Sequence, residues 1–320
     1  MRIALTLTTA SFALLMAAAC VPESDTPDAS AYIDALPDDR ILVAMPVGGN
    51  RAVGELAESY VTTAQVTTDV NGFISEVLDA VDHVTDFEPT WTADENKFLW
   101  GPWNEGGLDP NETALYVEYD EAANTYGWAI VQRPKGSTAD EDWVPVIGGE
   151  STPGATEDEG SGFFAVDFDA IASLNPAEAA AGKFYSSYIV TAAGVEAEAG
   201  FEDFTDDTSN PERVTAGYRY GQDAAGAGYM DLGYLADIHE DGSLEETIVL
   251  RTRWMADGQG RGDIVVFDGD LAPLAYQGSE CWGSDFSVVY EENNAELLMD
   301  GDESLCAFGD PEWNDDAPEA

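Results

Sequence analysis

The stretch YMDLGYLADIHEDGSLEETIVLRTRW, residues 229–254, has the most regular pattern in this sequence. Asp241-Gly242, a strong signal for a tight turn, divides it into two halves. Apolar residues that share one face under period-two alternation occur in both halves, at Met230, Leu232, Tyr234, Ala236 and Ile238 and then at Leu244, Ile248, Leu250 and Trp254. This alternation is typical of strands with one buried face. We therefore expect an antiparallel hairpin of Tyr229–His239 against Leu244–Trp254.

The same alternation appears on both sides of this hairpin. Further strands are expected at residues 113–119, 126–132, 143–147, 162–167, 184–191, 195–201, 263–267 and 286–290. About ten strands result, and no helical segments alternate with them, so the sheet should be antiparallel.

Two segments ahead of these strands have helical periodicity instead. Residues 51–67 and 69–84 repeat apolar residues with the spacing of a buried helix face, and Pro89 prevents continuation. We expect one long bent helix or a helix pair. The predicted fold class is α+β, with this helical element packed on a large curved antiparallel sheet, an open or half barrel, in a single domain over residues 40–310. The outline is similar to the open-barrel carriers of the lipoprotein-localisation kind, a likeness of fold only.

The chain is strongly acidic, with 63 acids against 12 bases and a net charge of −51. Such a field repels nucleic acids and anionic lipid headgroups, which we exclude as partners. A solvated surface explains the charge simply, and Ca²⁺ binding is the alternative. The weak Ca²⁺ candidates are Asp237, Asp241, Asp268 and Asp270. Tight turns explain the same residues better, so no metal site and no cofactor is assigned.

The N-terminus resembles a bacterial lipoprotein signal. Arg2 precedes an uncharged run that ends in Ala17-Ala18-Ala19-Cys20, with the small residues that a signal peptidase requires. The likeness of Met16–Cys20 to a lipobox implies removal of residues 1–19 and acylation of Cys20, with palmitate among the acyl groups. With Val21 next, it also implies sorting to the outer membrane, on its periplasmic face or at the cell surface. An uncleaved anchor and an ordinary secreted protein are the alternatives.

A lipid on Cys20 would make the acyl chains the only contact with the membrane. Residues 20–39, rich in acids and proline, are then expected to form an extended tether, and residues 311–320 an acidic tail. Two cysteines remain, Cys281 and Cys306, and the oxidising compartment of an exported protein favours a disulfide between them. Two free thiols are the alternative.

No catalytic motif is recognisable, and no catalytic residue is assigned. The two histidines, His83 and His239, fit structural roles, and the chain has neither a His-Glu-x-x-His nor a Gly-x-Ser-x-Gly motif. Aromatic rings in a Gly/Pro context can stack on sugars, although such residues more often close the end of a sheet. The candidates for ligand binding are Trp100, Trp103, Trp128 and Trp254.

Over most of its length the chain resembles uncharacterised acidic lipoproteins of myxobacterial type. The motifs that prompt this are Val70-Asn71-Gly72-Phe73, Trp100-Gly101-Pro102-Trp103 and Glu280-Cys281-Trp282 with a late Cys306. That family has no assigned activity. We hypothesise a non-enzymatic cell-envelope lipoprotein that binds an apolar ligand or an envelope partner or serves structurally, the ligand being unidentified. The alternatives are an extracytoplasmic carbohydrate-binding protein and a carboxylate-based hydrolase.

Overall fold

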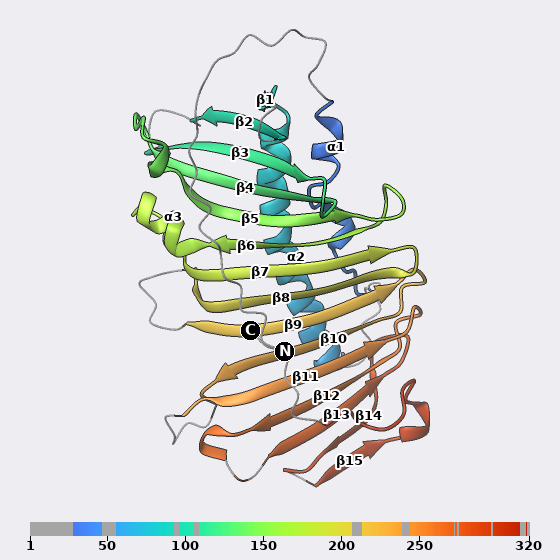
Figure 1. Ribbon diagram of the computed structural model, residues 1–320. Coiled ribbons are helices and arrows are strands. Elements are labelled where there is room, and N and C mark those ends of the chain that lie inside the picture. Colours follow the sequence, from blue (N-terminus) through green and yellow to red (C-terminus); the bar gives the residue numbers. More distant parts are fainter. Residues whose placement is uncertain are drawn as a thin grey trace.

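The computed structural model describes residues 28–46, 56–92, 96–104, 109–206, 213–238, 244–271, 273, 275–295, 297–313 and 318. Fifteen strands form one antiparallel sheet, and each strand pairs with its neighbours in the sequence (Figure 1). Within the described residues β1 and β15 are the two edges, so the sheet is open.

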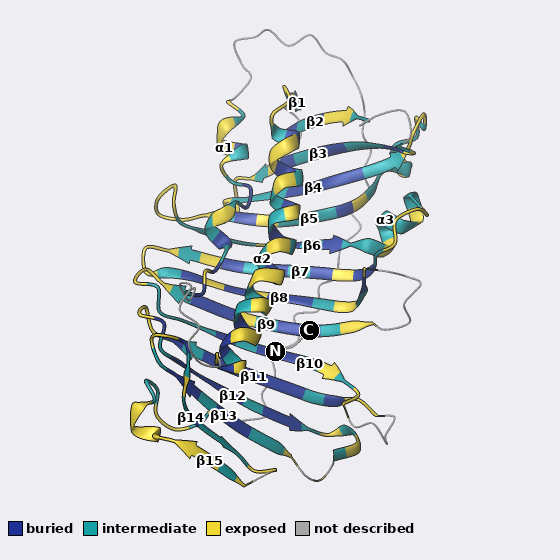
Figure 2. Cartoon of the chain, turned by 180° about the vertical axis from the view of Figure 1, so that it is seen from behind, coloured by how far each residue is buried: buried dark blue, intermediate teal, exposed yellow. Residues whose placement is uncertain are grey.

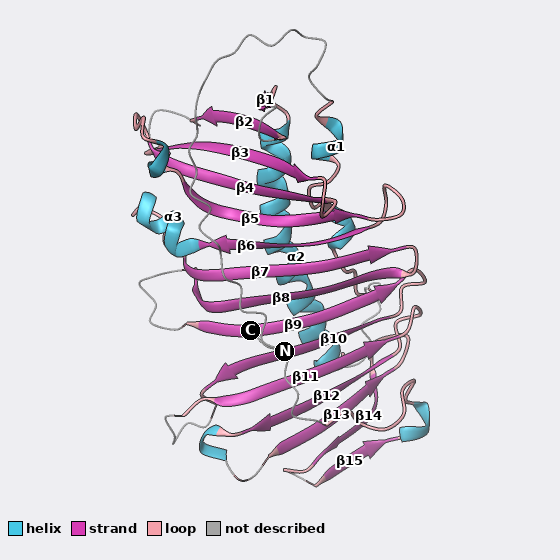
Figure 3. Cartoon of the chain, in the orientation of Figure 1, coloured by secondary structure: helices cyan, strands magenta, loops and turns pink. Residues whose placement is uncertain are grey.

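Strands outnumber helices throughout the molecule (Figure 3). The strands are β1 (Thr90–Thr92), β2 (Lys97–Trp103), β3 (Asn111–Asp120), β4 (Thr125–Pro134), β5 (Val144–Pro153), β6 (Gly160–Asp167), β7 (Ala181–Thr191), β8 (Gly194–Thr205), β9 (Val214–Asp223), β10 (Gly228–Ala236), β11 (Glu246–Trp254), β12 (Gly260–Phe267), β13 (Tyr276–Trp282), β14 (Val288–Asn293) and β15 (Leu298–Gly301). The α-helices are α1 (Ser30–Ile33), α2 (Glu58–Thr85) and α3 (Phe168–Leu174). Short 3-10 turns are η1 (Asp39–Ile41), η3 (Asp140–Asp142), η4 (Gly269–Leu271) and η5 (Glu303–Leu305).

The expected hairpin is present as β10 and β11, which pair from Gly228↔Trp254 to Ala236↔Glu246. Leu232 and Leu250 are partners across it and both are buried. The expected turn at Asp241-Gly242 lies outside the described residues. Toward that turn the predicted buried face ends early, since Leu244 is 58% exposed. The broad prediction of an α+β chain dominated by an antiparallel sheet is confirmed.

The two expected helical segments form one continuous helix, α2, of 28 residues. Residues 51–55 lie outside the described residues, and the helix begins at Glu58. Asp69, the first residue of the second expected segment, lies inside the helix. The apolar stripe is buried as the spacing predicts, at Val70, Ile74, Val77, Val81 and Val84.

Helix α2 lies across one face of the sheet, here called the inner face, and the opposite face is the outer face (Figure 2). Near its start, the Ser59 amide donates to Glu280 of β13 (2.7 Å), and the Thr63 and Thr252 hydroxyls are 2.7 Å apart. The helix also contacts β2. From β2 to β13 the path along a flat sheet is about 53 Å at 4.8 Å a strand, whereas the helix measures about 42 Å at 1.5 Å a residue. The sheet therefore bends toward α2.

The core lies between α2 and the inner face. Its largest fully buried side chains are Trp100, Trp254 and Trp282, each at most 1% exposed, together with Phe98, Phe164 and Phe184. One hydrophobic cluster joins these rings to the stripe of α2. This burial of aromatic surface is the main favourable contribution to folding.

On the outer face, one row of facing residues from β8 to β12 carries charges in alternation. Direct cross-strand neighbours are Glu198 and Arg219, then Asp231, Arg251 and Asp263. Opposite charges at facing positions of adjacent strands stabilise a sheet, while like charges there destabilise it. The outer face is therefore a built polar surface, in contrast to the aromatic inner face.

The folded body extends further at both ends than the sequence predicts. Residues 30–39, assigned to an extended tether, pack on the body: Tyr32 is 6% exposed and lies edge-on to Phe98, with the ring centres 4.9 Å apart. Trp313 of the expected acidic tail contacts β13. The apolar residues Tyr32, Ile33 and Leu36 account for the first difference, because acids and prolines around them hide their pattern.

Candidate functional site

A pocket of about 290 Å³ lies between the N-terminal segment and the sheet. One wall is the chain from α1 to η1, and the other is made by β4 to β7 with the turn between β5 and β6. The volume is close to the lower limit of roughly 300 Å³ for small-molecule sites. Most of the lining is apolar, with Leu36, Ile41, Tyr126, Pro153, Tyr188 and Val190 among the contributors.

The η1 turn is held by one ion pair. The Asp38 carboxylate accepts a hydrogen bond from the Arg40 amide (2.9 Å) and another from Arg40 Nε (2.7 Å). Arg40 Nη1 donates to the Glu157 carbonyl in the turn between β5 and β6. The hydrogen bond with Asp38 raises the pKa of Arg40. The contact with Glu157 therefore fastens the N-terminal segment to the turn between β5 and β6, and the pair with Asp38 leaves Arg40 with little capacity to bind an anion.

The floor of the pocket is uncharged. Tyr188 is 8% exposed, and its hydroxyl lies 3.2 Å from the Ser151 hydroxyl. Burial raises the pKa of Tyr188, and burial also raises that of Tyr126. Both phenols therefore stay protonated near neutral pH and present aromatic surface with one hydroxyl each.

The rim of the pocket is acidic. Asp34, Asp38, Glu157 and Glu159 line it against a single base, Arg40. In the wider field of a chain with net charge −51, this rim disfavours anionic ligands. None of the described residues that line the pocket is His, Cys or Lys. The geometry suits a small uncharged or cationic molecule with an apolar face, and it offers no nucleophile paired with a base.

The four tryptophans proposed for sugar stacking do not form a surface platform. Trp100, Trp128 and Trp254 are 0%, 3% and 1% exposed and belong to the core under α2. Trp103 is half-buried and stacks on Phe87, with the ring centres 6.3 Å apart. Period-two alternation places these rings on the inner face, because that is where the sheet buries its aromatic surface. The sugar-stacking prediction required exposed rings, and the structure does not place these four rings at the surface.

The weak Ca²⁺ candidates are dispersed or engaged in turns. Asp237 is exposed after β10, and Asp241 lies outside the described residues. Asp270 accepts a hydrogen bond from the Leu244 amide (2.9 Å), and Asp268 starts the η4 turn with φ 64°. Among the described residues, no three His, Cys, Asp or Glu side chains are grouped to hold a metal ion.

Of the two predicted cysteine roles, the structure bears on one. Cys281 of β13 and Cys306 after η5 form a disulfide with Cα atoms 5.4 Å apart, as expected. Cys20, the predicted lipidation site, lies outside the described residues. No helix in the part of the chain that the structure describes is both long enough and apolar enough to cross a membrane.

Comparisons with protein-family models, with curated proteins and with solved structures find no match to this chain. The sequence patterns did not predict the residues that line the pocket. Arg40 is the one base between residues 3 and 50, and its neighbours Pro37 and Asp38 are typical of a capped turn. That signal marks a structured turn, but its contact with Glu157 spans 117 positions and leaves no local trace.

Proposed function

We propose that this chain is a non-enzymatic lipoprotein of the outer membrane, anchored by acyl chains on Cys20, and that the pocket between η1 and β4 to β7 is its binding site. The observation that carries the binding role is the pocket itself, with its apolar lining, neutral phenols and fastened N-terminal wall. The likeness of residues 16–20 to a lipobox, and of the body to acidic lipoproteins without assigned activity, supports the anchor.

The ligand in this proposal is small and apolar or amphipathic. The broad inner face of the sheet is not the site, because α2 and the aromatic core fill it. A pocket of about 290 Å³ has the volume that roughly ten water molecules occupy in the liquid. A membrane lipid with several acyl chains requires far more space. This separates the proposed role from that of the open-barrel carriers.

Binding of a neutral sugar is the second candidate, favoured by one observation. Tyr126 and Tyr188 rings share the pocket with the hydroxyl-bearing side chains of Thr152, Thr156 and Ser161. Aromatic faces combined with several hydroxyl partners suit a saccharide ring. The carboxylate-based hydrolase gains no comparable support from the described residues.

The anchor is tested by metabolic labelling with palmitate in a Gram-negative host. Label should appear in the wild type and in Cys306→Ser, and it should disappear in Cys20→Ala. Cys306→Ser is the matched control because it also removes one cysteine, at a site not expected to carry lipid. Label that persists in Cys20→Ala would show that the anchor assignment is wrong.

The pocket is tested with two naphthalene probes that differ in charge. N-phenyl-1-naphthylamine, which is neutral, should bind with enhanced fluorescence, and the anionic anilinonaphthalene sulfonate should bind at least tenfold more weakly. Ala35→Trp, which fills the pocket, should weaken the neutral probe at least tenfold, whereas Ala122→Trp in the exposed turn after β3 should not. Equal binding by the two variants would remove the pocket as the site. Displacement of the probe by neutral saccharides would select the second candidate.

A further inference from the structure

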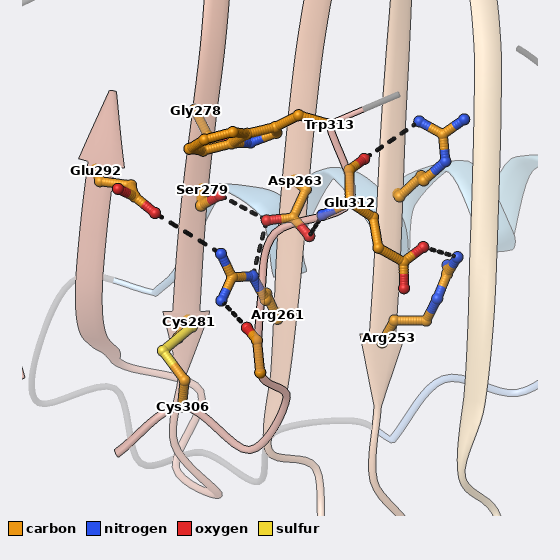
Figure 4. Close-up of polar contacts among 12 residues, drawn as sticks. Arg253, Arg261, Asp263, Gly278, Ser279, Cys281, Glu292, Cys306, Glu312 and Trp313 are labelled. Atoms are coloured by element: carbon orange, nitrogen blue, oxygen red, sulfur yellow. Dashed lines mark hydrogen bonds and ion pairs between the residues drawn. A yellow bond between two sulfur atoms is a disulfide. The ribbon is translucent and has the colours of Figure 1, made fainter. Parts of the chain in front are cut away.

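The segment Cys306–Trp313, here called the strap, crosses the outer face on the side opposite α2. It starts at the disulfide to Cys281 on β13 and then passes over β12 toward β11 (Figure 4). It pairs with no strand among the described residues, and side chains of the sheet bind its backbone at Gly309 and Glu312.

Two charged side chains of β12 hold the backbone of the strap. Arg261 donates from Nη1 to the Gly309 carbonyl. Asp263 Oδ2 accepts from the Glu312 amide at 3.0 Å. A donor and an acceptor that engage main-chain groups in this way can hold a peptide segment whatever its side chains.

Two further contacts involve side chains of the strap and can therefore distinguish one peptide sequence from another. Arg253 Nη2 lies 2.6 Å from Glu312 Oε2, a charge-assisted pair at the edge of the strap. The Trp313 indole donates from Nε1 to the Gly278 carbonyl of β13 at 3.1 Å (Figure 4). A glutamate followed by a tryptophan is therefore the pattern that this surface matches.

The receiving surface is ordered independently of the strap. Arg261 Nε donates to Asp263 Oδ1 (2.8 Å), and the Ser279 hydroxyl donates to the same oxygen (2.6 Å). With the strap in place, the Arg261 and Asp263 side chains are 2% and 4% exposed. These bonds within the sheet fix both groups in position before any peptide arrives, which lowers the cost of binding.

The strap itself is held far less firmly. No residue of Gly309–Trp313 is buried, and Gly309, Asp310 and Glu312 are exposed. Beyond the disulfide, the attachment of Gly309–Trp313 thus depends on polar contacts and the half-buried Trp313 ring, and none of these five residues is buried in an apolar core. Elements with few buried apolar contacts open at low free-energy cost while the rest of a protein stays folded.

We propose that the outer face of β11 to β13, centred on Arg253, Arg261 and Asp263, is a peptide-binding site whose resident ligand is Gly309–Trp313. The site accepts in trans a peptide with a carboxylate side chain followed by an indole. The charge distribution agrees with this role: residues 262–320 hold no base, so the strap is purely acidic and the sheet supplies every guanidinium. The site is on the opposite face from α2 and does not depend on the pocket or the lipid anchor.

The disulfide makes the resident strap a strong competitor. Cys306 lies three positions before Gly309, and a short tether gives its ligand an effective concentration in the millimolar range. A free peptide therefore gains access mainly when the strap is weakened. The proposal predicts that binding in trans is hidden in the wild type and appears when strap contacts are removed.

The test uses the full chain with Glu312→Ala and Trp313→Ala together, titrated by calorimetry with an acetylated and amidated peptide of residues 307–313. The variant should bind one peptide, and the wild type should bind it at least tenfold more weakly. In the variant background, Arg253→Gln should weaken binding at least tenfold. Arg219→Gln is the matched control: this arginine shares the outer face but pairs with Glu198, away from the strap, and its loss should leave binding unchanged.

Three results would overturn the proposal: no binding at millimolar peptide, equal binding by the wild type, or an equal loss in Arg219→Gln and Arg253→Gln. Hydrogen exchange on the wild type provides a measurement that needs no variant. The Glu312 amide should exchange much faster than the amides that pair β11 with β12, which shows local opening. Equal protection of both would mean that the strap is a fixed part of the sheet, and the site would then be closed to any partner.

Discussion

The contact between α2 and β11 gives a sharp test of how the helix sits on the sheet. Thr63 and Thr252 are both 0% exposed, and their hydroxyl oxygens are 2.7 Å apart. Thr63 Oγ1 also donates to the Ser59 carbonyl, one turn earlier in α2, at 2.7 Å. A hydroxyl has one proton, so Thr252 must be the donor in the pair. The two residues are therefore not equivalent.

The expected energies follow from that asymmetry. Thr63→Val removes the acceptor of a buried hydroxyl, which should lower the free energy of unfolding by about 1–3 kcal/mol. Thr252→Val leaves Thr63 bonded to Ser59 and should cost about 1 kcal/mol or less. In the double variant no hydroxyl is left without a partner, so adding Thr252→Val to Thr63→Val should restore stability.

The free energies of unfolding of the wild type, the two single variants and the double variant are measured by urea unfolding, followed by tryptophan fluorescence. They can be compared as a double-mutant cycle if the m-values are unchanged. The helix packing described here requires a coupling between the two sites and a larger effect for Thr63→Val. Additive effects, or a larger effect for Thr252→Val, would refute the reasoning. A Thr63→Val chain as stable as the wild type would do the same.

Three further predictions concern the sheet. A Cβ at Gly262 would lie 2.3 Å from Ser59 Cβ, so Gly262→Ala should cost about 1–3 kcal/mol by urea unfolding, whereas Gly127→Ala, with no atom within 4 Å, should be neutral or slightly stabilising. Replacing Cys281 and Cys306 together by serine should lower the unfolding free energy by about 3.5 kcal/mol, and reductant should then have no further effect; full stability in the double variant would contradict the chain-entropy estimate. Burial raises the pKa of Tyr218 to about 12, above the value near 10 of an unfolded tyrosine. The buried, protonated phenol therefore contributes fully to the free energy of unfolding below pH ~10, and this contribution is lost as the pH rises toward 12. Tyr218→Phe should make the alkaline fall in stability shallower, and an unchanged pH profile would contradict this.

Periodicity predicts the elements whose polar and apolar faces differ strongly. The β10–β11 hairpin and the apolar stripe of α2 could be predicted because their buried residues repeat without interruption. Strand β9 could not, since its outward positions include Gly217 and Gly221. The Tyr229 ring covers Gly221, where an added Cβ would lie 2.7 Å from it. A ring supplied by the next strand replaces the missing side chain, and one strand alone does not reveal it.

The candidate site was less predictable than the fold. Tryptophan content indicated aromatic surface, but which face each ring occupies depends on the strand's position against α2. The N-terminal wall of the pocket needs Arg40 to meet a carbonyl in the turn between β5 and β6, a contact between distant residues. Likewise the strap depends on arginines that precede residue 262 and on acids that follow it. The fold topology decides which of these distant residues meet. The amino-acid composition gives only the net charge of the chain.

The strict chain order of the fifteen strands has a mechanical consequence. Because each strand pairs only with its sequence neighbours, a force that peels an edge strand away from the sheet breaks the ladder with its one neighbour first. The sheet should then unzip hairpin by hairpin, and each released pair of about ten-residue strands would add roughly 70 Å of extended chain. The disulfide between Cys281 and Cys306 would keep the residues it encloses from extending. A body built in this order yields to tension in small steps and can close again in the same sequence when the load is removed.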